Sequence, residues 1–177
     1  MVKFESPKIV NIFGGPGAGK STTAAGIFYK MKQKGLNVEL VTEYAKDMTW
    51  EGRHNILGDQ LYVLAKQQRR VSRLVGKVDY VVTDAPFFLG LVYMEPDYLK
   101  TFEPLVLEAW ERYDNKSFML NRKNIAFQEV GRNQDASGAK VIDDKLHRLL
   151  NSRRIPFTEI VTSDSAVDEI LTHLKID

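Results

Sequence analysis

The stretch FGGPGAGKST, residues 13–22, decides the fold. It follows the apolar run KIVNI (8–12) and precedes TAAGIFYKMKQKG (23–35), whose apolar residues recur at helical spacing. A glycine-rich loop between a strand and a helix, ending in Gly-Lys-Ser, matches the phosphate-loop pattern G-x-x-x-x-G-K-[ST] in its confirming context. Glycines allow consecutive backbone N–H groups to wrap around a phosphate, and the helix directs its positive end at the same anion. The stretch therefore predicts a phosphate-binding loop rather than a glycine turn without a ligand.

The loop also predicts the cofactors, ATP and Mg²⁺. Lys20 is expected to reach the β- and γ-phosphates, and the Ser21 hydroxyl is expected to bind the metal. The residues expected to contact the nucleotide are Gly14, Gly15, Pro16, Gly17, Ala18, Gly19, Lys20, Ser21 and Thr22. Because motors, switches and transferases share this loop, it leaves open whether water or a second substrate receives the phosphate.

The rest of the chain alternates short apolar runs, rich in β-branched residues, with segments of helical period. This alternation is typical of a parallel sheet covered by crossover helices. The predicted strands are 8–13, 37–42, 79–84, 117–120 and 157–162. The predicted helices run from the loop to Gly35, over 57–75, from near Pro104, over 139–154 and from Ser165. We expect a three-layer α/β fold with a five-stranded parallel sheet, in one domain over residues 1–177.

Composition excludes several classes of function. The chain has 177 residues and 44% hydrophobic content, which suits one good core. Its formal net charge is +2 and its pI is near 8.7, so overall charge neither requires nor excludes a polyanionic partner. The absence of cysteine removes disulfides, thiolate catalysis and cysteine zinc sites. Since no leader-like segment and no apolar run of about 20 residues is visible, we expect a cytoplasmic protein without a membrane partner.

The second expected part of the site is an acid at the end of a neighbouring strand, and Asp84 follows the apolar run of DYVVTD. Its expected role is to hold the magnesium ion or its waters, and its structural alternative is a turn residue before Pro86. Many hydrolytic ATPases place a glutamate directly after this aspartate to activate water. Here Ala85 follows, which argues against a motor and in favour of a transferase.

A kinase also needs a carboxylate beside the acceptor hydroxyl. The segment TEYAKDM places Glu43 just past the second predicted strand, with Asp47 as the second choice. Glu43 is expected to accept or orient the acceptor proton, unless it is an ordinary loop acid or helix cap. Its neighbour Tyr44 is assigned to the substrate pocket with it.

Three further aromatic residues are candidates for stacking on the acceptor. Phe87 and Phe88 follow the third predicted strand, beside the expected position of the γ-phosphate, and Trp50 lies in DMTWEGRHN. Packing in the core is the alternative for the two phenylalanines.

The segment from about 121 to 138 has no clear period and is predicted to be a small lid. Its cations Arg122 and Arg132 are expected to stabilise charge during phosphoryl transfer, because the guanidinium fork matches phosphate oxygens. A closed lid would also exclude water from the reaction. Ordinary surface arginines are the alternative.

A basic stripe, defined as Lys66, Arg70, Arg73 and Lys77, lies opposite the apolar face of the second predicted helix. It is either a solvated helix face or a track for a nucleic-acid backbone.

Four segments together carry a resemblance to a known family: NIFGGPGAGKSTTAAGIFYKMK, VELVTEYAKDM, VVTDAPFFLG and GRNQDASGAKVID. They resemble bacteriophage P-loop kinases related to the nucleoside and nucleotide monophosphate kinases, including the thymidylate kinases. More narrowly, the chain is similar to the phage 5-hydroxymethyluracil DNA kinases over nearly its full length. The resemblance implies a P-loop kinase fold and phosphorylation of the hydroxymethyl group of that base in DNA, a step toward hypermodified thymines.

The sequence also departs from the thymidylate kinases. They usually carry an Asp-Arg pair after the second strand, which handles the acceptor's phosphate, whereas this chain has EYAKD with no arginine. The departure argues against a free monophosphate as acceptor. Three functions stay open: a kinase acting on a modified pyrimidine in DNA, a free deoxynucleoside or deoxynucleotide kinase, and an ATPase or switch module acting on a protein partner.

Overall fold

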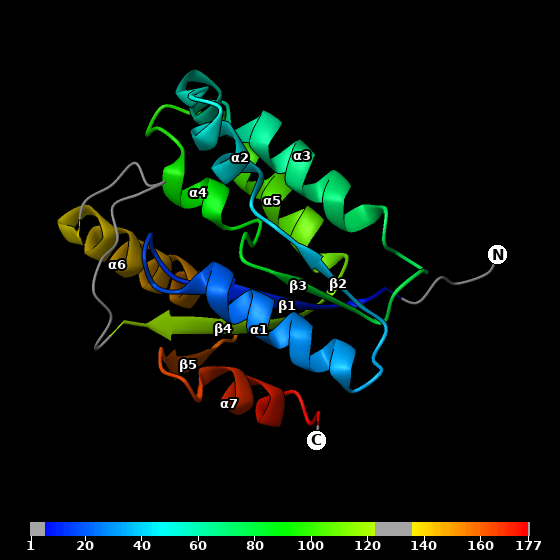
Figure 1. Ribbon diagram of the computed structural model, residues 1–177. Helices are drawn as coiled ribbons and strands as arrows, with labels where there is room; N and C mark the ends of the chain where they lie inside the picture. The colour runs from blue at the N-terminus through cyan, green and yellow to red at the C-terminus, as the bar shows by residue number, and fades with distance from the viewer. Residues whose placement is uncertain (1–5, 123–135, 177) are drawn as a thin grey trace.

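A five-stranded sheet forms the middle layer of the protein, and all its paired strands are parallel (Figure 1). The computed structural model describes residues 6–122 and 136–176. The strands are β1 (Lys8–Phe13), β2 (Val38–Val41), β3 (Tyr80–Thr83), β4 (Asp114–Asn121) and β5 (Thr158–Val161). Their order across the sheet is β2-β3-β1-β4-β5, so the strand before the glycine-rich loop is central and β2 is an edge strand.

Helices cover both faces of the sheet. They are α1 (Lys20–Gln33), α2 (Tyr44–Trp50), η1 (His54–Gly58, a 3-10 helix), α3 (Gln60–Ser72), α4 (Leu89–Tyr93), α5 (Phe102–Glu111), α6 (Ala136–Ser152) and α7 (Ala166–His173). Apolar residues of α1 and α7 pack on one face, and those of α3, α4, α5 and α6 pack on the other (Figure 1). The protein is therefore a three-layer α/β structure, as the alternating pattern predicted.

The central strand shows why the core has two halves. Successive side chains of a strand point to opposite faces of its sheet. Ile9 and Phe13 accordingly pack among residues of α3, α5 and α6, whereas Val10 and Ile12 pack among residues of α1 and α7. Because β1 is buried on both faces, its sequence is apolar almost without interruption, as is usual for parallel sheets.

The predicted elements agree with the observed ones closely but not everywhere. Each predicted strand is present, and β4 is three residues longer at its start because Asp114 pairs with Lys8 of β1. The helix predicted over 57–75 is divided into η1 and α3 and ends at Ser72. The short helices α2 and α4 were not predicted, because segments of seven and five residues are too short to show a helical period. In the described part of the chain, no helix has the length and apolar character needed to cross a membrane.

Candidate active site

Four strands bring chemically active side chains to one edge of the sheet. The phosphate loop (14–21) follows β1, Glu43 lies just past β2, Asp84 follows β3 and Arg122 follows β4. The carboxyl ends of parallel strands meet at the same edge, which is where open α/β sheets bind ligands. Residues far apart in the sequence are therefore gathered into one site by the parallel topology.

The phosphate loop turns through glycines in left-handed conformations. Gly17 has a φ of 81° and Gly19 a φ of 88°, so any side chain at these positions would strain the backbone. Gly19 is also the N-cap residue of α1, which begins at Lys20. The Lys20 ammonium donates to the carbonyl oxygen of Gly15 at 3.2 Å, which places its charge over the loop.

Three carboxylates act on the charge of Lys20. Burial lowers the pKa of Lys20, while the negative charges of Glu43, Asp84 and Asp143 raise it in opposition. Burial raises the pKa of Glu43, and the positive charge of Lys20 offsets part of that increase. Removal from water disfavours the ionised form of any group, so burial lowers the pKa of a lysine and raises the pKa of a glutamate. Titratable groups perturbed in this way and gathered in a cleft are typical of catalytic sites.

The site offers a place for a magnesium ion. Asp84 is only 3% exposed, and its Oδ1 is a buried atom without a hydrogen-bond partner among the described residues. A buried carboxylate oxygen needs a partner, and Mg²⁺ or its bound water supplies one. The described residues contain no group of three or more His, Asp or Glu side chains able to hold a metal. The buried carboxylate of Asp84 fits Mg²⁺, which is usually held by one or two protein ligands together with substrate phosphates. Ser21, exposed at the start of α1, is the second candidate ligand.

A cavity of about 720 Å³ opens beside the phosphate loop. Its walls come from the loop, α2, η1, α3, α4 and the turn after β3, and they include Lys20 and Glu43. This volume lies within the range of small-molecule sites. A phosphate bound in the loop and a second ligand beside Glu43 would therefore occupy one continuous space.

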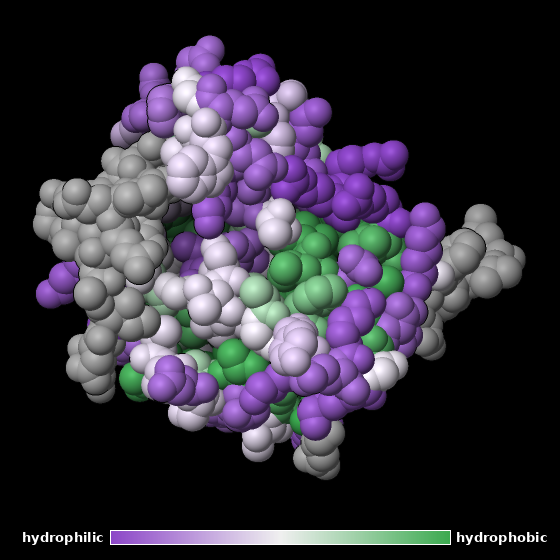
Figure 2. All heavy atoms as spheres, viewed as in Figure 1, coloured by the Kyte–Doolittle hydropathy of each residue, from purple (hydrophilic) through white to green (hydrophobic). Residues whose placement is uncertain are grey.

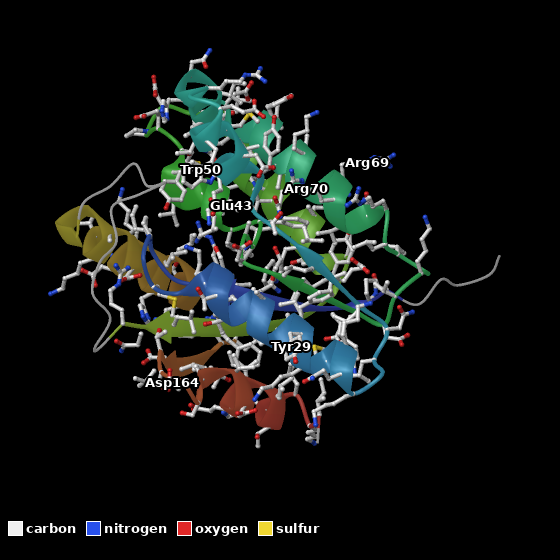
Figure 3. All side chains as sticks on the ribbon, viewed as in Figure 1. Tyr29, Glu43, Trp50, Arg69, Arg70 and Asp164 are labelled. Carbon is white, nitrogen blue, oxygen red and sulfur yellow. The ribbon has the colours of Figure 1, made fainter. Side chains whose placement is uncertain are left out.

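The aromatic residues predicted for the substrate pocket divide into two groups. Tyr44, Trp50 and Phe87 line the cavity, and Trp50, at the end of α2 opposite to Glu43, is 62% exposed (Figure 3). Phe88 has no exposed surface, and its ring packs edge-on against Trp110 with centroids 4.8 Å apart. The prediction that Phe88 stacks on a substrate is therefore wrong. The chain turns into α4 directly after Phe88, and this turn directs the ring into the core.

Arg122 contacts the phosphate loop itself. Its Nη1 donates to the carbonyl oxygen of Pro16 at 2.7 Å, and its Nη2 pairs with Asp143 of α6 at 2.7 Å. The other carboxylate oxygen of Asp143 accepts the backbone N–H of Gly15 at 2.5 Å. Arg122 and Asp143 thus tie the first turn of the loop to α6. The expectation that Arg122 stabilises the transferred phosphoryl group stays a prediction.

Two residues of the site were missed by the sequence analysis. Asp143 contacts the loop, and Tyr93, the last residue of α4, lines the cavity. Burial raises the pKa of Tyr93, and the charges of Glu43 and Asp143 raise it further, so its hydroxyl stays a neutral hydrogen-bond donor. The amphipathic pattern of α6 gave no reason to distinguish Asp143 from Asp144. Tyr93 belongs to a helix too short to be predicted.

Most of the predicted lid falls outside the described residues. Arg132 lies in 123–135, outside the described residues, so its role stays a prediction. Of the segment 121–138, the structure describes Asn121, Arg122 and the start of α6.

The basic stripe is interrupted in the structure. Arg70 pairs with Asp47 at 2.5 Å, while Lys66, Arg73 and Lys77 are exposed. Figure 2 shows hydrophilic residues along α3, but the helix ends at Ser72, so the stripe does not continue along one helical face. The ion pair also explains why Asp47, the second choice for the acceptor-side acid, does not line the cavity.

Gly15 is expected to tolerate no side chain. A Cβ atom there would lie 2.6 Å from the carbonyl oxygen of Ala139 and 2.8 Å from both Arg122 Nη2 and Asp143 Oδ1. We expect Gly15→Ala to lower the free energy of unfolding by about 1–3 kcal/mol, because overpacking forces the contacting groups apart. Urea denaturation checks this, with Gly58→Ala as the control, since no atom of the described residues lies within 4 Å of a Cβ at that glycine. Equal losses in the two variants would contradict the expectation.

The fold and the phosphate loop define a class, the α/β proteins with a P-loop kinase-like fold. Residues 9–166 match the profile of the family described as AAA domain, and the chain belongs to that family. Comparison with curated proteins by sequence gives no match.

Solved structures of the same fold resemble the chain at low identity. Deoxyadenosine kinase from M. mycoides, bound to dCMP and dCDP, is 12% identical with a TM-score of 0.56, over 94% of this chain and 98% of that one. NadR in complex with NAD and AMP-PNP is 15% identical with a TM-score of 0.67, over 97% of this chain and 50% of NadR. APS kinase CysC from Mycobacterium tuberculosis, in complex with AMPPNP and APS, is 16% identical with a TM-score of 0.51, over 97% and 98% of the two chains. At these identities the likeness establishes the fold.

Proposed function

We propose that the protein is a kinase that transfers the γ-phosphoryl group of ATP to a hydroxyl group of a nucleoside-like acceptor. The observation that carries the proposal is the shared cavity, in which Glu43 and the phosphate loop line the same space. The acceptor oxygen attacks the γ-phosphorus, the bond to the bridging oxygen of ADP breaks, and Glu43 accepts the hydroxyl proton. Lys20 and the loop N–H groups hold the phosphates during this step. Ser21 and Asp84 would hold Mg²⁺, which would supply positive charge to offset that of the phosphates.

The lining of the cavity favours an acceptor without a phosphate of its own. The basic side chains among the described lining residues are Lys20, Lys46 and His54, and arginine is missing from them. Lys20 is expected to be occupied by the nucleotide, and Arg70, which contacts Thr42 next to Glu43, is already paired with Asp47. The exposed aromatic ring of Trp50 suits a planar base.

The finer proposal is that the acceptor is the hydroxymethyl group of 5-hydroxymethyluracil in DNA. It is supported by the sequence resemblance and by Trp50, whose exposed ring at the cavity could stack on a base taken out of the helix. Such an acceptor would require the base to be flipped or single-stranded before it reached Glu43.

A free deoxynucleoside or deoxynucleotide is the second candidate acceptor. It is favoured by the interruption of the basic stripe at Arg70, which leaves a shorter surface for a nucleic-acid backbone. It also agrees with the similar structure of deoxyadenosine kinase, which was determined with dCMP and dCDP. An ATPase or switch module is less well supported, because Ala85 stands where a water-activating glutamate is expected and lines a cavity large enough for a second substrate.

The deciding experiment follows labelled γ-phosphate from ATP into a panel of acceptors. The panel contains 5-hydroxymethyluracil DNA, ordinary DNA, free deoxynucleosides and their monophosphates, with Lys20→Ala as the blank. Label on the modified DNA alone would support the finer proposal, and the KM for that DNA should rise steeply between about 50 and 200 mM salt. Label only on small molecules would favour the second candidate. Hydrolysis of ATP without transfer to any acceptor would overturn the kinase proposal.

A further inference from the structure

The turn that carries Glu43 lies beyond the hydrogen bonds of the sheet. β2 is an edge strand, and its pairing with β3 ends at Val41, opposite Thr83. Thr42 and Glu43 therefore have no strand partner in the part of the chain that the structure describes, and Tyr44 begins α2, where backbone N–H groups have no partner within the helix. The backbone on both sides of Glu43 must find other hydrogen-bond partners.

Gln67 of α3 supplies partners on both sides. Its Oε1 accepts the backbone N–H of Tyr44 at 3.2 Å, and its Nε2 donates to the carbonyl oxygen of Thr42 at 3.3 Å. The side chain is 4% exposed, so these contacts are made away from bulk water. One amide group thus bridges the two peptides that flank Glu43.

Arg70, one turn further along α3, contacts the same turn. Its Nη1 donates to the carbonyl oxygen of Thr42 at 2.9 Å, and its Nη2 pairs with Asp47 of α2 at 2.5 Å. The guanidinium also lies over the ring of Tyr44, with Cζ 5.4 Å from the centroid. Figure 3 shows Arg70 on the side of α3 that faces α2, whereas Arg69 points away from it.

We propose that Gln67 and Arg70 are positioning residues that hold Glu43 at the cavity in the orientation needed to accept the acceptor proton. The inference rests on the role of Glu43 in the proposed function. The same two side chains fix the peptide before Glu43, and Gln67 also fixes the peptide after it. A catalytic group displaced by about 1 Å can lose about 10²-fold in rate, so the fixation of this turn matters for transfer.

The test compares Gln67→Met and Arg70→Met, which keep approximate length and remove the polar contacts, with Arg69→Met as the matched control on the same helix. We expect kcat at saturating acceptor to fall about tenfold in the first two variants. This loss is smaller than the roughly 10²-fold cost of displacing a catalytic group by about 1 Å, because each variant removes only some of the contacts that hold the turn. The KM for ATP should stay within about twofold, because neither residue contacts the phosphate loop. Arg69→Met should leave kcat unchanged.

A double-mutant cycle distinguishes positioning of Glu43 from a general structural effect. In a Glu43→Gln background the proton-accepting carboxylate is already absent, so Gln67→Met should reduce the remaining rate by less than about twofold. An equal tenfold loss in both backgrounds would overturn the inference. If Glu43→Gln by itself left transfer unchanged, the assignment of Glu43 in the proposed function would fail instead.

Amide hydrogen exchange provides a readout that does not depend on activity. The Tyr44 amide should exchange several-fold faster in Gln67→Met than in the wild-type protein, and at the wild-type rate in Arg69→Met. Unchanged protection of Tyr44 in Gln67→Met would overturn the inference. Faster exchange of the Tyr44 amide in Gln67→Met without a loss of kcat would also overturn the inference.

Discussion

Replacing Glu43 with glutamine is expected to lower kcat for phosphoryl transfer by about 10²- to 10⁴-fold, the usual contribution of a positioned general base. Glutamine keeps the size of the side chain but cannot accept the proton of the acceptor hydroxyl. ATP binding should be affected little, because the phosphate loop and Lys20 remain intact. Transfer of labelled phosphate at saturating ATP and acceptor measures the effect.

The control for this variant is Asp47→Asn, which changes the other carboxylate of the same segment. Asp47 is paired with Arg70 and does not line the cavity, so its replacement should cost at most about tenfold, through displacement of the turn. A larger loss from Asp47→Asn than from Glu43→Gln would contradict the assignment.

The pH dependence of the wild-type reaction provides a second check on Glu43. Burial raises its pKa, and a base must be ionised to act, so activity should rise with pH through this raised value. The acid limb of kcat/KM for the acceptor should therefore lie at a higher pH than an ordinary glutamate would give. Glu43→Gln should lose this limb.

Replacing Lys20 with methionine is expected to lower transfer by about 10²- to 10³-fold, comparable to the loss of one preorganised charge-stabilising group. The Lys20 ammonium lies over the phosphate loop, at 3.2 Å from the carbonyl oxygen of Gly15, and its charge is expected to face the bound phosphates. Methionine keeps an unbranched side chain of similar length while removing that charge. ATP binding by calorimetry should weaken together with the rate.

Lys32→Met is the matched control, because Lys32 lies near the other end of α1, where its charge is partly exposed and paired with Glu39 at 3.6 Å. That substitution should change neither transfer nor ATP affinity. A loss smaller than about tenfold in Lys20→Met, with Lys32→Met unchanged, would mean that the loop amides alone hold the phosphates.

Much of the site could be predicted because its parts are local patterns. The glycine-rich loop between an apolar strand and a helix is a continuous sequence feature, and Asp84 directly follows a recognisable strand. Parallel topology then places the end of β2, and with it Glu43, at the same edge. The positions of Asp84 and Glu43 could therefore be predicted without knowing any contact between distant residues.

The residues that were missed or misassigned depend on contacts between elements. Phe87 and Phe88 are identical in type and adjacent, and only the turn into α4 decides that one lines the cavity and the other packs on Trp110. In the sequence, Arg70 resembled one member of a basic helix face. Its contacts with Thr42 and Asp47 could not be predicted, because these two residues belong to the segment after β2.

The sequence by itself therefore determined the α/β class, the phosphate loop with Lys20, and the strand ends that carry Glu43 and Asp84. Periodicity and glycine spacing act over a few residues, so a single segment is enough to show them. The tertiary structure decided how the loop and the Glu43 turn are held. Asp143 meets Gly15 across 128 residues of sequence, and Gln67 meets Tyr44 across 23. Hydrogen bonds of this kind depend on where folded helices pack, and no local pattern specifies that position.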